Sequence, residues 1–279
     1  MLVDKPAGLT SHDVVQRIRR VVGVRAVGHT GTLDPFATGL LVVLVGRATR
    51  LARFLEGEAK TYLATARLGS RTDTDDLTGT PLGEPARIDG MEESLVGREL
   101  ARFVGTQRQR PPSFSAKHVG GERSYRRARR GEAVAPAEIT VTIHRIDLVA
   151  FRPPEVVFRA TVSAGTYLRA IARDLGERLA VGAHLTALRR EMIGALRVED
   201  AVPLDQASLA HLRPALAVLG HLPAVPVDDP GRTAVMHGRP LPAEERLAGQ
   251  VALLYAGEVI AVARADRGWL RPTVVVGTP

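Results

Sequence analysis

The sequence predicts an α+β protein with a large body and a small β module at its C-terminal end. Three observations lead to this prediction. Helical and strand patterns follow one another without the regular βαβ alternation of a doubly wound sheet. Two alternating segments in the middle of the chain are typical of an antiparallel pair. Short strands separated by Gly257 and Gly268 follow a region of proline and glycine that begins at Pro223.

The length and composition describe a folded globular chain. It has 279 residues, of which 45% are hydrophobic and 24% are charged, as in packed domains and unlike disordered tails. At roughly 100–200 residues per domain, we expect a large domain at residues 1–220 and a smaller one at 222–279. Pro223, Pro226 and Pro230 mark the boundary between them.

The first elements follow from apolar spacing and from punctuation by glycine and proline. Residues 13–22 have apolar positions at helical spacing, and the Ser11 hydroxyl stands at the N-cap position. Three glycines and Pro35 predict a loop over residues 28–39. The continuous apolar run 40–45 then predicts a strand that is buried on both faces.

The remainder of the chain continues this mixture of elements. Alternation over residues 60–68 predicts a half-buried strand, and apolar spacing makes 166–179 the clearest amphipathic helix. The other predicted elements are a polar loop at 71–83, helices at 92–103, 123–130 and 204–219, and strands at 140–149, 155–162, 185–192, 251–255, 259–263 and 273–276.

The positive charge of the chain is concentrated in one segment. Lysine and arginine total 38 against 30 acidic residues, so the formal net charge is +8. Residues 98–130 alone carry ten basic and two acidic residues, so the rest of the chain sums to zero. Such a basic segment favours binding of a polyanion such as nucleic acid, because phosphate contacts release counterions. A solvated charged face is the alternative interpretation.

The residue types exclude several kinds of chemistry. The chain has no cysteine, which excludes disulfides, thiolate catalysis and metal sites with cysteine ligands. The patterns HExxH, GxxxxGK[ST] and GxSxG do not occur, which argues against zinc proteases, P-loop hydrolases and α/β-hydrolases. Asp73, Asp75 and Asp76 lack the terminal glutamate of an EF-hand calcium loop. We therefore expect no metal and no cofactor.

Two features of the sequence argue against a membrane or exported protein. The longest aliphatic run, residues 40–45, is far shorter than the ~18 residues that a membrane-spanning helix needs. The first residues, MLVDKP, lack a basic-then-apolar leader. We therefore expect a cytoplasmic protein.

One glycine-rich segment concentrates the residue types of a reactive site. It reads GHTGTLDPFATGLL from Gly28 to Leu41. Glycines allow the backbone to approach a ligand closely. Pro35 disfavours helical geometry at Asp34, so that this carboxylate projects from a fixed turn. An aspartate in a turn is also often purely structural, and the alternative is a nucleophile or an acid–base group.

This segment closely resembles the GHTGxLDPxATGxL signature of the TruB family, the bacterial tRNA pseudouridine-55 synthases. Four further segments agree in order and spacing over residues 2 to about 195: LVDKPAGLTS at 2–11, KTY at 60–62, LG at 68–69 with TDT at 72–74, and GTYLR at 165–169 with DLG at 174–176. The resemblance implies a pseudouridine synthase-like fold, with a mixed, largely antiparallel central sheet and flanking helices. From about residue 222 the chain resembles the PUA-type RNA-binding module of this family.

The resemblance implies an isomerase that converts the uridine at position 55 in the tRNA T loop to pseudouridine, on a flipped-out base and without a cofactor. Asp34 corresponds to the catalytic aspartate, Arg169 to the arginine that pairs with it, and Tyr62 to the tyrosine that stacks on the target base. The other implied substrate-binding residues are His29 in nucleotide extrusion and Tyr167 and Leu188 in the base pocket. Lys5 and Pro6 are expected to be mainly structural.

The resemblance also implies an RNA-binding insertion in the basic segment 98–130. The phosphates of the T arm would be contacted there by Arg126, Arg127, Arg129 and Arg130. The family pattern PPxYSAxKxxG is altered in this chain, because Phe114 replaces the tyrosine and His118 stands where a lysine is expected. A role for that lysine is therefore in doubt.

Two alternatives from other classes of protein stay open. One is a non-catalytic RNA-binding or tRNA-folding protein of the same fold, against which the intact set Asp34, Tyr62 and Arg169 argues. The other is a guide-RNA-dependent pseudouridine synthase subunit with partner proteins. Because the chain contains both the basic segment and the catalytic set, we expect a stand-alone, monomeric enzyme that acts on tRNA.

Overall fold

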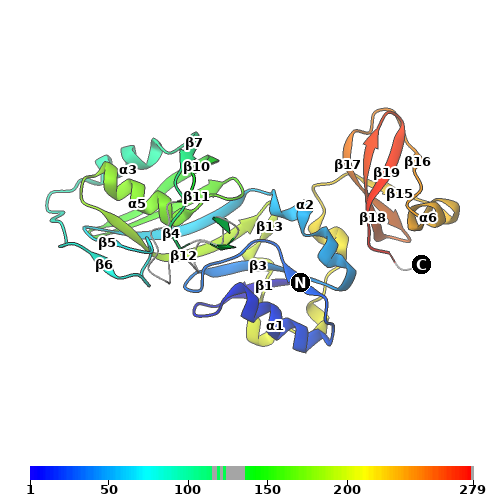
Figure 1. Cartoon of the computed structure of the whole chain (residues 1–279), viewed down its shortest axis with the longest axis horizontal. Coiled ribbons are helices and arrows are strands. Elements are labelled where there is room, and N and C mark those ends of the chain that lie inside the picture. Colours follow the sequence, from blue (N-terminus) through cyan, green and yellow to red (C-terminus); the bar gives the residue numbers. More distant parts are fainter. Residues whose placement is uncertain (115–117, 120–121, 124–135, 278–279) are drawn as a thin grey trace. The chain divides into compact units, whose positions relative to one another are not determined.

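The computed structural model of the chain describes residues 1–114 and 136–277, together with the backbone of 118–119 and 122–123 (Figure 1). It divides into two compact units. The first unit consists of Met1–Pro35, Gly39–Gly57 and Gly194–Pro279, and the second of Phe36–Thr38 and Glu58–Ile193. None of the helices within the described residues is long and apolar enough to cross a membrane.

The first unit contains short strands arranged around one buried strand. Strand β3 (Thr38–Val45) pairs antiparallel with β1 (Leu2–Lys5) and with β2 (Val27–His29). Strand β14 (Val202–Pro203) lies parallel to β1. The apolar run predicted to be a strand is confirmed, and its residues from Gly39 to Leu44 are buried. The loop predicted at 28–39 is shorter than expected, because both of its ends are in strands.

Helix α1 (Ser11–Val22) packs on this sheet and begins one residue earlier than the sequence predicts. Its N-cap is Thr10, not Ser11, because Thr10 and Asp13 form a reciprocal capping box. The Thr10 hydroxyl accepts from the Asp13 amide at 3.1 Å, and the Asp13 carboxylate accepts from the Thr10 amide at 2.9 Å. The Thr10 hydroxyl also donates to the Asp13 carboxylate at 2.6 Å, and this hydrogen bond together with that from the Thr10 amide holds the pKa of Asp13 below its ordinary value. Ser11 is thereby released for another role.

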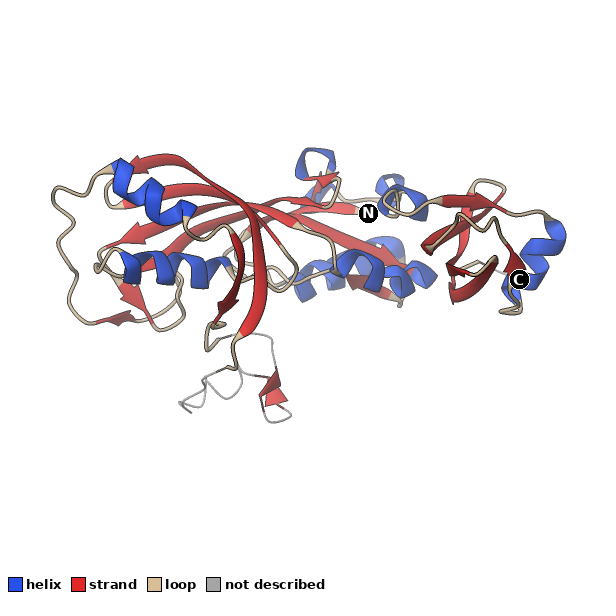
Figure 2. Ribbon diagram, turned by 90° about the horizontal axis from the view of Figure 1, so that it is seen from above, coloured by secondary structure: helices blue, strands red, loops and turns tan. Residues whose placement is uncertain are grey.

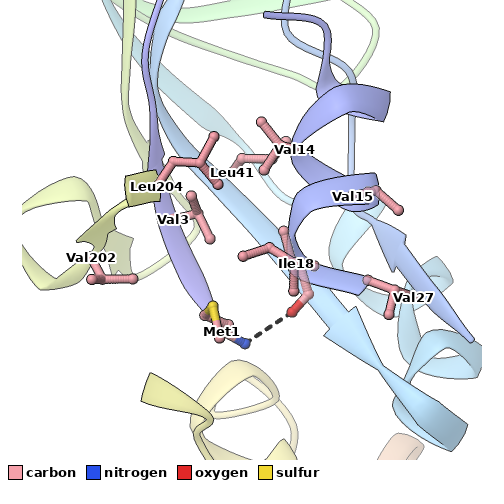
Figure 3. Packing of buried hydrophobic residues seen from close by; sticks show 10 residues of the cluster. Met1, Val3, Val14, Val15, Ile18, Val27, Leu41, Val202 and Leu204 are labelled. Carbon is pink, nitrogen blue, oxygen red and sulfur yellow. Dashed lines mark hydrogen bonds between the residues drawn. The ribbon is translucent and has the colours of Figure 1, made fainter. Parts of the chain in front are cut away.

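A hydrophobic cluster joins this helix to the sheet (Figure 3). Val14, Val15 and Ile18 of α1 are buried against side chains of β1 and β3, among them Val3 and Leu41. The apolar face of the helix has the i, i+4 spacing that the sequence shows, which is why the helix lies on the sheet in this orientation.

The second unit contains five antiparallel strands in the order β12–β4–β11–β10–β7. Figure 2 shows its long strands lying side by side. The strands are β4 (Lys60–Leu68), β7 (Gly105–Gln109), β10 (Ile139–Arg152), β11 (Glu155–Val162) and β12 (Ala183–Ile193). Helix α5 (Leu168–Arg178) packs on β12 and β4, and α3 (Glu93–Ala101) packs on β10. The predicted α+β class with a largely antiparallel sheet is confirmed.

The polar loop predicted at 71–83 contains a short hairpin of β5 (Arg71–Thr72) and β6 (Pro81–Leu82). The helix predicted at 123–130 lies outside the described residues, apart from the strand backbone at Arg123. The remaining short elements are η1 (Gly46–Leu51), α2 (Arg53–Glu56), β8 (His118–Val119), β9 (Glu122–Arg123), β13 (Leu196–Arg197) and η2 (Val198–Asp200).

The prediction of a helix at 204–219 is wrong. The segment forms three separate 3₁₀ turns, η3 (Leu204–Gln206), η4 (Leu209–His211) and η5 (Ala215–Val218). Pro214 has no amide hydrogen to donate and disfavours helical geometry in the residue before it. Ser208 starts a new turn by capping η4. The apolar spacing was therefore overruled by these two residues.

The C-terminal residues of the first unit form a second sheet in the order β15–β17–β18–β19–β16. Its strands are β15 (Ala224–Pro226), β16 (Leu241–Pro242), β17 (Gly249–Tyr255), β18 (Glu258–Asp266) and β19 (Trp269–Val275). Helix α6 (Asp229–Met236) contributes Val235 to a hydrophobic core formed with the three long strands. A domain boundary near residue 222 stays a prediction.

The cluster beneath α1 supports a stability prediction. Ile18 is fully buried in it, so Ile18→Ala removes apolar contacts and leaves a cavity. We expect the free energy of unfolding to fall by about 2–5 kcal/mol in urea titrations. Arg17→Ala, on the exposed face of the same helix, is the control and should change it by less than about 0.5 kcal/mol. Equal effects of the two substitutions would contradict the packing described here.

Candidate active site

Asp34 lies in the turn between β2 and β3. The backbone of the preceding residue, Leu33, is fixed by hydrogen bonds. The hydroxyl of Ser11, which is only 2% exposed, accepts a hydrogen bond from the Leu33 amide at 2.9 Å. The same hydroxyl donates to the Leu33 carbonyl at 3.2 Å. One side chain thus satisfies both polar groups of a buried residue, which fixes the backbone directly before Asp34.

The residue after Asp34 is held as well. The Pro35 carbonyl accepts from the Lys5 ammonium at 3.2 Å and from the Gly8 amide at 2.8 Å. Lys5 is fully buried and also donates to the carbonyls of Pro6 at 2.9 Å and Leu9 at 2.6 Å. Three carbonyl acceptors are what a buried ammonium needs. Lys5 therefore has the structural role expected from the sequence, and half-buried Asp34 lies between two fixed neighbours.

His29 lies at the other end of this connection, on β2, where it pairs with Val43 of β3 and is half-buried. The next residue, Thr30, is fully buried, and its amide donates to the Val42 carbonyl at 3.1 Å. The ladder therefore continues one residue beyond β2. The loop proper is short, which limits the conformations open to the residues around Asp34.

In the second unit, Tyr62 and Leu188 lie on one face of the sheet. Tyr62 of β4 is directly opposite Arg190 of β12, and Leu188 is opposite Ala64, one step along the same face. The exposed fractions are 9% for Tyr62, 8% for Leu188 and 1% for Arg190. A cation buried in the row next to Tyr62 sets this face apart from an ordinary apolar core.

Tyr167 stands at the N-cap of α5, where its backbone is held by one amide side chain. Gln109, which is 4% exposed at the end of β7, donates to the Tyr167 carbonyl at 3.1 Å. The Gln109 side-chain oxygen accepts from the Tyr167 amide at 2.9 Å. This two-point contact fixes the start of the helix on which Arg169 lies two residues further on.

Arg169 is buried on α5 and forms an ion pair with Asp76, which lies in the loop after β5. The Arg169 guanidinium is 3.3 Å from the Asp76 carboxylate, and both side chains are 6% exposed. Arg169 also donates to the carbonyls of Thr74 and Phe114, each at 3.0 Å. The second carboxylate oxygen of Asp76 accepts from the Thr74 hydroxyl at 2.8 Å and the Thr78 amide at 2.9 Å. A buried pair with this many hydrogen bonds holds its arginine in one geometry.

A second arginine, one helical turn further along, repeats the arrangement. Arg173 donates to the Asp75 carboxylate at 3.0 Å, to Asp174 at 2.8 Å and to the Arg110 carbonyl at 3.0 Å. Burial raises the pKa of the Asp75 carboxyl above its ordinary value, although Arg173 acts in the opposite direction. The two arginines of α5 therefore bind two consecutive aspartates and the backbone at 110–114.

The structure brings some of the predicted site residues together within each unit. Asp34 and His29 belong to the β2–β3 connection of the first unit. In the second, Tyr62 and Leu188 share a sheet face, and Tyr167 and Arg169 share the start of α5. Their proposed roles stay predictions. Outside the described residues lie Arg126, Arg127, Arg129 and Arg130. No group of three His, Cys, Asp or Glu side chains suited to a metal ion occurs among the residues described.

Sequence analysis missed two residues that shape this region. Asp76 was considered only as a calcium ligand, although Thr74 and Thr78 beside it are the polar neighbours that a buried carboxylate needs. Gln109 gave no signal, because its partner is the backbone of a residue 58 positions away.

Comparison with solved structures identifies the class of fold. The chain superimposes with a TM-score of 0.71 on a protein of the "Crystal Structure of a Cbf5-Nop10-Gar1 Complex", at 26% identity, covering 99% of this chain and 82% of that one. A second superposition, on a protein of the "Structure of H/ACA RNP bound to a substrate RNA containing 2'-deoxyuridine", has a TM-score of 0.74 at 24% identity. It covers 99% of this chain and 84% of that one.

Comparison of sequences gives the family. Residues 19–168 match the family described as TruB family pseudouridylate synthase (N terminal domain). A tRNA pseudouridine synthase B from Thermobifida fusca is 44% identical over 99% of this chain and 97% of its own length. One from Burkholderia pseudomallei is 42% identical over 100% of this chain and 96% of its own. The chain therefore belongs to the TruB family of pseudouridylate synthases.

The Asp76–Arg169 pair leads to a second stability prediction. Asp76→Asn removes the carboxylate and leaves the Arg169 charge buried beside a neutral amide. We expect the free energy of unfolding to fall by about 3 kcal/mol in urea titrations. Asp73→Asn is the matched control, because this exposed neighbour makes a hydrogen bond to the Thr80 amide instead, and it should cost less than about 1 kcal/mol. A cost as small for Asp76→Asn would show that the pair is dispensable.

Proposed function

We propose that this protein isomerises the uridine at position 55 in the T loop of tRNA to pseudouridine. The observation that carries the proposal is the identity of 44% over 99% of the chain with an enzyme named tRNA pseudouridine synthase B. The turn around Asp34 supports it, since the flanking residues Leu33 and Pro35 are both held by buried polar side chains.

The reaction needs one carboxylate and no change of oxidation state. Asp34 attacks the target nucleoside, either at the sugar or at the base. The bond from C1′ to N1 breaks, the uracil rotates, and a bond from C1′ to C5 forms. The bond between Asp34 and the nucleoside also breaks, so that the carboxylate is regenerated. N1 gains a proton and C5 loses one, so that substrate and product are isomers. A nucleophile held in a fixed turn avoids the entropic cost of positioning it in each turnover.

The other proposed residues bind and orient the base. Tyr62 stacks on the extruded uracil and helps to remove the proton from C5, and Tyr167 and Leu188 line the base pocket. His29 takes part in extruding the nucleotide. Arg169 pairs with Asp34 and keeps it ionised. The contacts of Arg169 with Asp76 and two carbonyls leave its guanidinium little freedom to turn.

The T arm of tRNA is the proposed binding partner. The target nucleotide must leave its stack before it can react, at a cost on the order of a few kcal/mol. Contacts of the basic segment with the phosphates of the arm would offset this cost.

We further propose that the enzyme works in the cytoplasm as a monomer without an obligatory protein partner. The likeness to a protein of a Cbf5-Nop10-Gar1 complex favours the alternative of a subunit that depends on partners. Incubation of the purified chain with a bare tRNA transcript distinguishes the two. Conversion without other proteins supports the stand-alone enzyme. If the tRNA is bound but stays unconverted, the chain is either a dependent subunit or a non-catalytic RNA-binding protein.

Asp34→Asn should abolish turnover, because an amide cannot replace the carboxylate as nucleophile. We expect the rate of pseudouridine formation, mapped by carbodiimide modification or mass shift, to fall at least about a thousandfold. The affinity for tRNA should stay within about threefold. Asp89→Asn is the control, since Asp89 is exposed and pairs only with exposed Arg87 among the described residues. Appreciable activity of Asp34→Asn would remove this residue from the role of nucleophile.

Neutralising the predicted phosphate contacts should weaken tRNA binding and reduce its dependence on salt. In this variant, glutamine replaces four arginines, namely Arg126, Arg127, Arg129 and Arg130. Each lost phosphate contact should lower the slope of log affinity against log salt by about 0.7–0.9. The control replaces four exposed arginines elsewhere, Arg53, Arg87, Arg197 and Arg239. An unchanged slope in the first variant would move the RNA contact to another surface.

A further inference from the structure

The hydroxyl of Thr30 is buried without a hydrogen-bond partner, close to the turn that carries Asp34. Thr30 is fully buried, and its amide donates to the Val42 carbonyl at 3.1 Å. Its side-chain oxygen, in contrast, has no partner in the described part of the chain. An unpartnered buried hydroxyl costs free energy, which an equally branched apolar side chain such as valine avoids.

Elsewhere the chain pairs its buried hydroxyls. That of Ser11 binds both polar groups of the Leu33 backbone. That of Thr72, a residue that is 6% exposed, donates to the Asp76 carbonyl at 2.7 Å. Among the buried hydroxyls that the structure describes, the one of Thr30 alone has no partner. Packing in the free protein therefore does not explain why position 30 carries a hydroxyl.

The backbone that follows Thr30 can change conformation over two residues at most. The ladder between β2 and β3 ends at the Thr30 amide, and Leu33 is fixed by its two hydrogen bonds. Between these fixed points lie Gly31 and Thr32. Gly31 has a φ of 96°, a left-handed conformation that glycine adopts without strain, and Thr32 is exposed. Any rearrangement directly before Asp34 is thus confined to this pair.

We propose that Thr30 is a positioning residue whose hydroxyl gains its partner only when the substrate is bound. In the complex, the hydroxyl oxygen accepts from the amide of Thr32, two residues further on, as threonine does in ST turns. In the free protein this amide forms no hydrogen bond with the described residues and is open to water. Covering the turn with RNA excludes that water, which makes the internal hydrogen bond favourable.

This hydrogen bond couples substrate binding to the position of the carboxylate. The inference rests on the proposed function, because the substrate is the T arm of tRNA. The free protein carries the cost of the unpartnered hydroxyl, and the complex recovers it, so the reactive conformation of the turn is favoured in the complex alone. Asp34 lies two residues beyond Thr32 and is held more tightly once the turn is closed.

Thr30→Val tests the state of the hydroxyl in the free protein. The substitution removes the unpartnered group, so the urea midpoint of unfolding should rise by about 0.5 M. Thr72→Val is the matched control, because the same change at a paired hydroxyl should lower the midpoint. A lower midpoint for Thr30→Val would overturn the proposal, since it would show that the hydroxyl is already satisfied before RNA binds.

The same variant should be slower although it is more stable. At saturating T-arm hairpin, the rate of pseudouridine formation by Thr30→Val should fall about tenfold, because the reactive conformation of the turn is less populated. The affinity for the hairpin should stay within about threefold. Thr30→Ser keeps the hydroxyl and should react within about threefold of the wild-type rate. A more stable Thr30→Val variant that reacts at the wild-type rate would refute the positioning role.

Amide hydrogen exchange keeps this inference apart from the proposed function. In the complex with the hairpin, the Thr32 amide should exchange at least about tenfold more slowly in the wild type than in Thr30→Val, because only the wild type offers the acceptor. If the wild type binds the hairpin without converting it, the proposed function fails, whereas this difference in exchange still supports the closed turn. Conversion by the wild type with equal exchange in both proteins refutes the role of Thr30 alone.

Discussion

The buried ammonium of Lys5 is the interaction on which the geometry around Asp34 depends. A charge without hydrogen-bond partners would be very costly at a fully buried position, so the chain must supply carbonyl oxygens on every side of it. It does so from Pro6, Leu9 and Pro35, which forces the N-terminal segment and the turn after β2 together. Ser11 completes the arrangement on the other flank of the aspartate through Leu33. The backbone on both sides of the carboxylate is thus held by buried side chains.

The second unit solves a related problem with arginines. Arg169 and Arg173 are four residues apart and therefore lie on one side of α5, from which each reaches a carboxylate of the loop after β5. The cost of burying these charges is offset by pairing them with carboxylates and by hydrogen bonds to main-chain carbonyls. Loop, helix and the chain at 110–114 are consequently held as one body. Removing Asp76 takes this carboxylate away from the buried Arg169 charge, whereas Arg173 keeps Asp174 when Asp75 is removed.

Local patterns in the sequence were sufficient for most of the fold. The strands at 60–68, 155–162 and 185–192 and the helix α5 follow from apolar spacing alone. The helix predicted at 204–219 failed because Pro214 outweighs its spacing. The sequence predicts Ser11 as the N-cap of α1, whereas its hydroxyl binds the backbone of Leu33. This contact has no local signal, because Leu33 is 22 residues away. Contacts of this kind, like that of Gln109 with Tyr167, involve backbone groups, which have no sequence signature. The family resemblance supplied the site residues, but their neighbours had to come from the structure.

The contacts of Arg169 and Arg173 with residues 110–114 have a consequence for how this part of the chain can evolve. Both arginines hold main-chain oxygens, those of Phe114 and Arg110, and every amino acid offers the same oxygen. Substitution of the side chains at positions 110 and 114 therefore leaves the acceptors of these hydrogen bonds in place. The contact at position 114 is therefore the same for the phenylalanine of this chain as it would be for a tyrosine.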